Sequence, residues 1–184
     1  MAATPSNMMP LGAQAPSFKL PDTISGKIIS LDELTPEKAL VIMFICNHCP
    51  YVLHIIDEFA EIGRTYQEKG VKFVAISSND VEQYPQDGPE KMKDFAKTHG
   101  FTYPYLYDES QDVAKIYMAA CTPDLYVFNA SLECVYRGQF DESRPKNDVP
   151  VSGNHLLNAL DATIAGEKVD PDQKPSLGCN IKWK

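Results

Sequence analysis

Apolar and polar positions follow two different periods along this chain, and each period predicts a different element. Residues 39–45 are continuously apolar, which is typical of a central strand covered on both faces. Directly after them, apolar residues recur at helical spacing until Gly70 ends the pattern. The residues that carry this helical pattern are Val52, Ile55, Ile56, Phe59, Ile62 and Tyr66. A buried strand is therefore predicted to lead straight into an amphipathic helix.

The remaining patterns extend this alternation of strands and helices. They predict strands at residues 17–20, 27–30, 71–77, 103–107, 125–128 and 133–136, helices at 89–99, 110–120 and 154–165, and a capped helical turn at 30–34. The first two strands form an N-terminal β-hairpin extension, and the strands at 125–128 and 133–136 form a closing hairpin. The predicted fold class is α/β, with a mixed central sheet and helices on both faces.

Length and composition predict one domain. A chain of 184 residues with 43% hydrophobic content can bury a single sizeable core. Residues 1–11 are rich in small residues and proline, so we expect a flexible N-terminal arm there. Residues 12–184 are expected to form the domain, with the C-terminal tail docked on it through Trp183.

The charge and cysteine content narrow the class of partner and the compartment. A formal net charge of -8 argues against a nucleic-acid or anionic-membrane surface. The longest apolar run is too short to span a bilayer, and the start lacks the pattern of a secretory signal. Five cysteines form an odd and modest set, unlike a disulfide scaffold. We therefore expect a soluble, cytoplasmic protein with a few working thiols.

Cys46 and Cys49 form a C-x-x-C pair at the predicted change from strand to helix. A helix start favours negative charge, so we expect Cys46 to ionise readily and to act as the nucleophile. Cys49, one helical turn further on, would be the resolving thiol. The His48 imidazole between them should stabilise the thiolate and make the pair more oxidising. This pattern predicts a two-electron thiol-disulfide exchange site.

Three motifs carry a resemblance to known families. The C-x-x-C pair together with Cys121-Thr122-Pro123 resembles the thioredoxin superfamily. The opening GxxAPxFxLPD at residues 12–22 is similar to the redoxin branch, which holds peroxiredoxins and the TlpA- and ResA-type thiol-disulfide reductases. The segments FICNHCPYV at 44–52 and GCNIKW at 178–183 resemble an uncharacterised family of the AhpC/TSA group with a CNHCP motif.

The resemblance implies a thioredoxin-like fold, with Pro123 as a cis-proline that faces the disulfide. Thr122 would offer backbone hydrogen bonds to a bound substrate chain, and Cys121 would lie near the rim of the active site. The implied partners are a disulfide-containing protein or small thiol substrate and an external thiol reductant, without a cofactor or metal. Thioredoxins also carry a buried acid below the second cysteine. Leu40 stands there in this chain, so the acid is unidentified.

Other roles are open for several cysteines. The C-x-x-C pair could be half of a zinc site completed by His48, Cys121, Cys134 or Cys179, although no second close pair exists. Cys134 lies among apolar neighbours and is expected to be an inert core thiol. Cys121 is balanced between packing residue and accessory thiol. Two roles are open for the tail that contains Cys179. Either the tail merely docks on the domain, which we favour, or it brings Cys179 to the site as an accessory thiol.

Two further functions compete with disulfide exchange. In a peroxiredoxin-like thiol peroxidase, Cys49 would be the peroxidatic cysteine and Cys46 would replace the usual threonine. That family also places an arginine near the thiolate, for which Arg137 or Arg144 could substitute if the fold brings it close. The third reading is a redox-inert peptide-binding module, which we rank last because nothing in packing requires two cysteines at a helix start.

Overall fold

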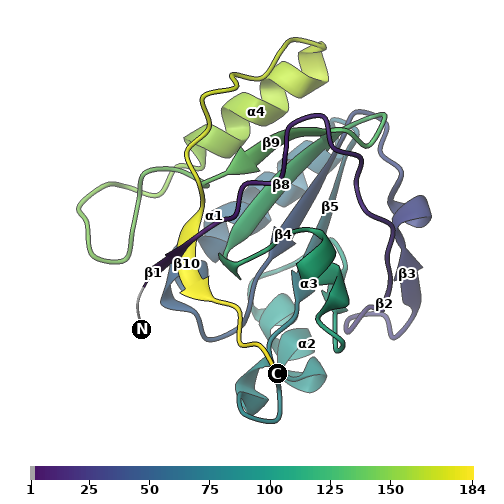
Figure 1. Cartoon of the computed structure of the whole chain (residues 1–184), viewed down its shortest axis with the longest axis vertical. Coiled ribbons are helices and arrows are strands. Elements are labelled where there is room, and N and C mark those ends of the chain that lie inside the picture. Colours follow the sequence, from purple (N-terminus) through teal and green to yellow (C-terminus); the bar gives the residue numbers. More distant parts are fainter. Residues whose placement is uncertain (1–2) are drawn as a thin grey trace.

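A five-stranded mixed sheet forms the centre of the computed structural model, which describes residues 3–184 (Figure 1). Its strand order is β6-β5-β4-β8-β9. The central strand β4 runs parallel to β5 and antiparallel to β8. The strands are β4 (Ala39–Phe44), β5 (Val71–Ser77), β6 (Tyr105–Tyr107), β8 (Asp124–Asn129) and β9 (Cys134–Gly138). The mixed sheet predicted from the hydrophobic pattern is confirmed.

Helices cover both faces of this sheet. Helices α1 (Pro50–Gln67), α2 (Pro89–Thr98) and α4 (Asn154–Ala165) contribute to one hydrophobic core, and the short α3 (Asp112–Ile116) and the 3-10 turn η1 (Leu31–Leu34) contribute to the other. Alternate residues of β4 enter different cores: Val41 faces the first, and Leu40 faces the second. This two-sided burial explains why the central strand is continuously apolar. Among residues 3–184, no helix is long and apolar enough to cross a membrane.

The N-terminal hairpin is also confirmed, as β2 (Lys19–Pro21) paired with β3 (Ile28–Ser30). The helix predicted over residues 110–120 is shorter than expected. Gln111 before it and Met118 after it both adopt left-handed backbone conformations, with φ of 67° and 57°. These conformations cannot continue a right-handed helix, so only one short helical segment remains between them.

A second sheet joins the two ends of the described chain. Strand β10 (Leu177–Asn180) lies between β1 (Ala3–Pro5) and β7 (Cys121–Thr122), and both pairings are antiparallel (Figure 1). The sequence predicted a flexible arm at residues 1–11, but from residue 3 onward the structure differs. Residues 3–5 pair with the edge of β10, and the side chain of Met9 is buried. Residues 1 and 2 lie outside the described residues.

Candidate functional site

The C-x-x-C segment lies between the end of β4 and the start of α1. Cys49 is the N-cap residue of α1, and Pro50 is its first helical residue. The expectation that Cys46 begins the helix and that Cys49 lies one turn inside it is wrong. A proline at the first helical position is well placed, but it keeps the residue before it out of the helical conformation, and Cys49 is accordingly extended. Three residues thus separate Cys46 from the first helical residue, Pro50.

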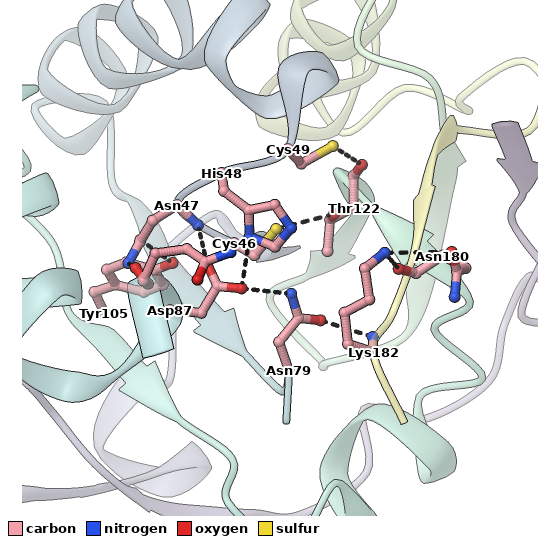
Figure 2. Close-up of polar contacts among 11 residues, drawn as sticks. Cys46, Asn47, His48, Cys49, Asn79, Asp87, Tyr105, Thr122, Asn180 and Lys182 are labelled. Atoms are coloured by element: carbon pink, nitrogen blue, oxygen red, sulfur yellow. Dashed lines mark hydrogen bonds and ion pairs between the residues drawn. The ribbon is translucent and has the colours of Figure 1, made fainter. Parts of the chain in front are cut away.

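Thr122 contacts both sulfur atoms. Cys49 Sγ donates a hydrogen bond to the backbone carbonyl oxygen of Thr122 at 3.1 Å, and Cys46 Sγ lies 3.5 Å from Thr122 Oγ1 (Figure 2). The Thr122–Pro123 peptide bond is cis, as the family resemblance implies. Both thiols are free, and their residues are only 1% and 0% exposed for Cys46 and Cys49. The pair is therefore a closed site beside the cis-proline.

The surroundings separate the two thiols in acidity. A hydrogen bond from the Cys46 thiol lowers the pKa of Cys49 to about 5, and further hydrogen bonds from Cys179, Thr122 and the Val52 amide act in the same direction against the effect of burial. The same bond between the two thiols, together with burial and the nearby Asp87 carboxylate, raises the pKa of Cys46. Cys49 is therefore the thiol that ionises more readily, in agreement with its place at the helix start.

Asp87 organises the loop beside the pair. It ends the 3-10 turn η2 (Pro85–Asp87), and its side chain is fully buried. The backbone N–H of Asn47 donates to Asp87 Oδ1 at 2.8 Å, and the side-chain Nδ2 of Asn79 donates to Asp87 Oδ2 at 2.8 Å (Figure 2). The His48 ring atom Nδ1 also lies 2.8 Å from Oδ2. These contacts hold a carboxylate next to Cys46, and the sequence patterns did not single it out.

The signal that could have found Asp87 is topological. Strands β4 and β5 are parallel, so the loops that follow them meet at the same edge of the sheet. One loop contains the C-x-x-C pair, and the other runs from Asn79 to Gly88 and contains several acids. Periodicity within either loop could not show which acid turns inward.

His48 lies between an aromatic ring and the buried acid. Its ring stacks on Tyr84, with centroids 5.5 Å apart and planes 3° from parallel. Ligand atoms of Cys46, His48 and Asp87 lie within 4.8 Å of one another, so these three residues could hold a metal ion. Cys121, Cys134 and Cys179, the partners considered for a zinc site, do not belong to this group. Each Asp87 oxygen already accepts one N–H donor, so a cation would share these oxygens with Asn47 and Asn79.

Tyr105 reaches the site from β6. Strand β6 is at the edge of the main sheet, inside the segment 103–107 for which the sequence predicts a strand. Tyr105 is fully buried, and its hydroxyl donates to Asn47 Oδ1 at 3.0 Å. It therefore supports the C-x-x-C segment as well as filling the core.

The C-terminal tail completes the site from the other side. Cys179 in β10 pairs with Thr122, and its thiol belongs to the same buried cluster as Cys46 and Cys49. The Lys182 amide donates to Asn79 Oδ1 at 2.9 Å, so the tail also joins the loop that holds Asp87 (Figure 2). The tail is docked, but through β10, since Trp183 is 41% exposed. The expectation of docking through Trp183 is wrong.

The same pairing changes the expected role of Thr122. Sequence resemblance implied that its backbone would bind a substrate chain, whereas in the structure β10 occupies that position. Cys121 is buried, its thiol points to the Pro123 carbonyl oxygen at 3.6 Å, and burial raises its pKa. Cys134 is buried in the core on the opposite face of the sheet, as predicted.

The two candidate arginines have other partners. Arg137 Nη1 donates to Gln173 Oε1 at 3.1 Å. Arg144 donates to the backbone carbonyls of Asp141 and Ser143, and it lines a small cavity together with Pro123. Of the two, only Arg144 borders the cavity beside the cis-proline.

Comparison with known proteins adds a family and close structural relatives. The AhpC/TSA family profile matches residues 11–137. An uncharacterized conserved protein from Geobacillus kaustophilus is 55% identical, with a TM-score of 0.98 over 100% of this chain and 97% of that chain. A hypothetical protein from Sinorhizobium meliloti 1021 is 42% identical, with a TM-score of 0.96 over 98% of each chain.

A more distant solved structure shows the fold alone. The peroxidoxin BcpB from Mycobacterium tuberculosis is 20% identical, with a TM-score of 0.66 over 88% of this chain and 100% of that chain. No curated protein matches the chain. The comparisons therefore establish ancestry and architecture, and the chemistry has to be argued from the thiols.

Proposed function

The chain belongs to the AhpC/TSA family of thioredoxin-like redoxins, and on that premise we propose that it is a thiol-disulfide oxidoreductase with Cys46 and Cys49 as its redox pair. The observation that carries this proposal is that Thr122 contacts both free thiols, with Cys49 Sγ 3.1 Å from its carbonyl oxygen and Cys46 Sγ 3.5 Å from its hydroxyl oxygen. In this arrangement the pKa of Cys49 is lowered and the pKa of Cys46 is raised. One thiol is prepared to attack as a thiolate, and its neighbour is prepared to follow as a protonated thiol.

The reaction follows from this asymmetry. The Cys49 thiolate attacks one sulfur of a substrate disulfide, which breaks that bond and releases a first substrate thiolate. Cys46 then gives up its proton and attacks Cys49, which forms the Cys46–Cys49 disulfide and releases the second substrate thiol. The substrate gains two electrons, and an external thiol reductant restores the pair. These roles are the reverse of those expected from the sequence, because Cys49 is at the helix start.

Asp87 and Thr122 support the two steps. The Asp87 carboxylate, whose ligand atom lies within 4.8 Å of the Cys46 sulfur, is a nearby acceptor for the Cys46 proton. The Thr122 carbonyl oxygen accepts a hydrogen bond from the Cys49 thiol, and the Thr122 hydroxyl contacts Cys46, so one residue fixes the relative position of both sulfurs. Tyr105 and Asp87 hold Asn47, which fixes the turn between the cysteines.

Burial of the pair favours a small substrate. With Cys46 and Cys49 at most 1% exposed and β10 paired to Thr122, a folded protein could not bring its own disulfide to the sulfurs without displacing the tail. A low-molecular-weight disulfide or thiol needs a smaller opening. We therefore favour such a compound over a protein as substrate and reductant.

A redox titration tests this function. The protein is equilibrated in glutathione buffers over a range of potentials, free thiols are alkylated, and the cysteine peptides are identified by mass. Cys46 and Cys49 are expected to lose their free thiols together as a two-electron couple. Cys134→Ala is a matched control, because that buried thiol lies in the opposite core and should leave the midpoint unchanged. If Cys46 and Cys49 never form a disulfide, the proposed exchange mechanism is wrong.

A thiol peroxidase is the second candidate, and the placement of Cys49 favours it. Cys49 is an N-cap thiol of lowered pKa directly before Pro50, and Arg144 lines the cavity beside Pro123. Attack of the thiolate on a hydroperoxide would form a Cys49 sulfenic acid and release water or an alcohol, and Cys46 would then form the disulfide with loss of water. Hydroperoxide consumption by the reduced protein, abolished in Cys49→Ser, would identify this activity. If the protein exchanges disulfides but leaves hydroperoxide untouched, the peroxidase candidate is excluded.

A further inference from the structure

Cys179 is a third thiol packed in the same buried region as the redox pair. It belongs to the same buried core cluster as Cys46 and Cys49, and its residue is only 3% exposed. Burial raises the pKa of its thiol to about 12, and the neighbouring Cys49 thiol acts in the same direction. Cys179 therefore shares one buried cluster with the redox pair, although it comes from the distant C-terminal strand.

The fold brings this strand unusually close to the site. The register of β10 on β7 pairs Cys179 with Thr122. The carbonyl oxygen of Thr122 accepts the hydrogen bond from the Cys49 thiol. The neighbouring Gly178 has no side chain, and a Cβ atom there would lie 2.0 Å from that same carbonyl oxygen. Only glycine fits this approach, so the backbone around Cys179 is adapted to lie against the cis-proline turn.

The other two cysteines are not placed in this way. The Cys121 thiol contacts the carbonyl oxygens of Pro123 and Ser176, at 3.6 and 4.0 Å. Cys134 lies in the core on the opposite face of the sheet and contacts the Tyr136 carbonyl oxygen at 3.6 Å. The pairing with Thr122, whose carbonyl oxygen accepts a hydrogen bond from the Cys49 thiol, therefore distinguishes Cys179 from the remaining thiols.

We propose that Cys179 is a third redox-active thiol, which exchanges with the Cys46–Cys49 disulfide to form a Cys49–Cys179 disulfide. This step rests on the proposed function, because that function supplies the first disulfide. The Cys179 thiol gives up its proton, and its sulfur attacks Cys49. The bond to Cys46 breaks, and Cys46 leaves with the electron pair and takes up a proton. One S–S bond forms and one breaks, so the step needs no external oxidant.

The exchange changes which cysteine is a free thiol in the oxidised protein. The Cys49–Cys179 disulfide would join the start of α1 covalently to β10, across the Thr122 backbone. Cys46 would then be a free thiol again while the protein as a whole remains oxidised. The tail thereby becomes part of the redox cycle.

Peptide mapping of the oxidised protein tests the proposal. Glutathione disulfide is the oxidant, acid quench and alkylation fix the result, and trypsin digestion follows without reductant. Cys46 and Cys49 share the tryptic peptide 39–64, whereas Cys179 lies in peptide 169–182. A Cys46–Cys49 disulfide therefore stays within one peptide, and the proposed disulfide links two. We expect both products in the unmodified protein.

Two variants assign the sulfurs and separate this proposal from the function it rests on. In Cys46→Ala, only Cys49 remains in peptide 39–64, and oxidation should link that peptide to 169–182. In Cys179→Ala, the disulfide within 39–64 should form alone. One outcome would reject only the role of Cys179: Cys179→Ala forms the disulfide within peptide 39–64, but neither the unmodified protein nor Cys46→Ala links this peptide to 169–182. The redox pair would then stand. If Cys179→Ala forms no internal disulfide, the redox pair itself is wrong, and the exchange step falls with it. A link from 39–64 to peptide 116–137, which holds Cys121 and Cys134, in place of 169–182 would also overturn the proposal.

Discussion

The Cys49 thiol donates a hydrogen bond to the carbonyl oxygen of Thr122, with the two atoms 3.1 Å apart. This contact gives the neutral thiol an acceptor, while the donors around the sulfur stabilise the thiolate. Cys49 therefore has partners in both protonation states. The predictions that follow test how much of the site depends on this arrangement.

The acidity of Cys49 should depend on Cys46. The hydrogen bond from the Cys46 thiol is the largest cause of the lowered pKa of Cys49, about 5, so its loss in Cys46→Ala should raise that pKa. Ultraviolet absorbance of the thiolate as a function of pH measures it in the reduced protein. Cys46→Ser keeps a hydroxyl donor and should give an intermediate value. An unchanged titration in Cys46→Ala would show that the bond is not the cause.

The stability of the reduced protein should rise with pH between about 5 and the ordinary thiol pKa of about 8.5. In this interval the unfolded chain holds a proton on Cys49 and the folded chain does not. The contribution of the thiolate is therefore fully present above the unfolded pKa and is lost as the pH falls through the folded pKa. Urea unfolding at several pH values measures the rise, which should be absent in Cys49→Ala. An equal rise in that variant would assign it to other groups.

Above the ordinary thiol pKa the trend should reverse. Burial or buried hydrogen bonds raise the pKa of the other four cysteines, Cys46, Cys121, Cys134 and Cys179. The folded chain then holds protons that the unfolded chain has lost, so stability should fall as the pH rises. Unfolding in alkaline buffer measures this fall. Cys134→Ala should weaken it without affecting the redox pair, whereas a continued rise would contradict the raised values.

Asp87→Asn should destabilise the protein by about 3 kcal/mol. Both carboxylate oxygens accept N–H donors inside the protein, and an amide group would turn a donor toward one of them. Denaturant unfolding measures the loss. The exposed Glu90, at the start of α2, supplies the matched control Glu90→Gln, which should change little. If both variants lose a similar free energy of unfolding, the change in net charge would be the cause, and not the loss of the buried contacts.

Gly178→Ala should also destabilise the protein, by about 3 kcal/mol, because its Cβ would overlap the Thr122 carbonyl oxygen. The tail would have to move away from the cis-proline turn, and the Cys49–Cys179 contact should weaken with it. Gly88→Ala is the control, since its backbone conformation suits alanine and its Cβ would lie 3.3 Å from the nearest neighbouring atom, the Pro85 carbonyl oxygen. Equal effects in the two variants would refute this steric account.

Tyr105→Phe should cost about 1 kcal/mol, the usual worth of one hydrogen bond, because its hydroxyl donates to Asn47. Tyr103 is a matched control on the same sheet face. Its buried hydroxyl has no hydrogen-bond partner within residues 3–184, so Tyr103→Phe should be neutral or slightly stabilising. Thermal unfolding of the two variants compares them directly. If Tyr103→Phe is the more damaging change, the assignment of the Asn47 contact is wrong.

The parts of this fold that sequence reasoning predicted well are those with local patterns. The continuous apolar run of β4 and the helical spacing of α1 each arise from one element packing against the cores. The cis-proline followed from a motif. The start of α1 at Pro50 could have been predicted, since proline favours the first helical position. The C-x-x-C pattern instead led to the prediction that the helix starts at Cys46.

The rest of the site depends on contacts between segments far apart in the chain. Asp87, Asn79 and Lys182 meet through loops that carry no periodic pattern. The short β1 and β10 strands lack enough residues for an alternation to appear, and their pairing depends on the edge that β7 offers. Sequence patterns describe the layers of this molecule better than its edges.

The position of β10 also orders events during folding. Cys46 and Cys49 lie in the first third of the chain, whereas the strand that covers them is made of residues near its C-terminal end. Contacts between such distant segments form late, because closing a long loop costs entropy before any contact offsets it. Until β10 docks, we expect the Cys46–Cys49 pair to be open to solvent, and the docking of this strand to close the site.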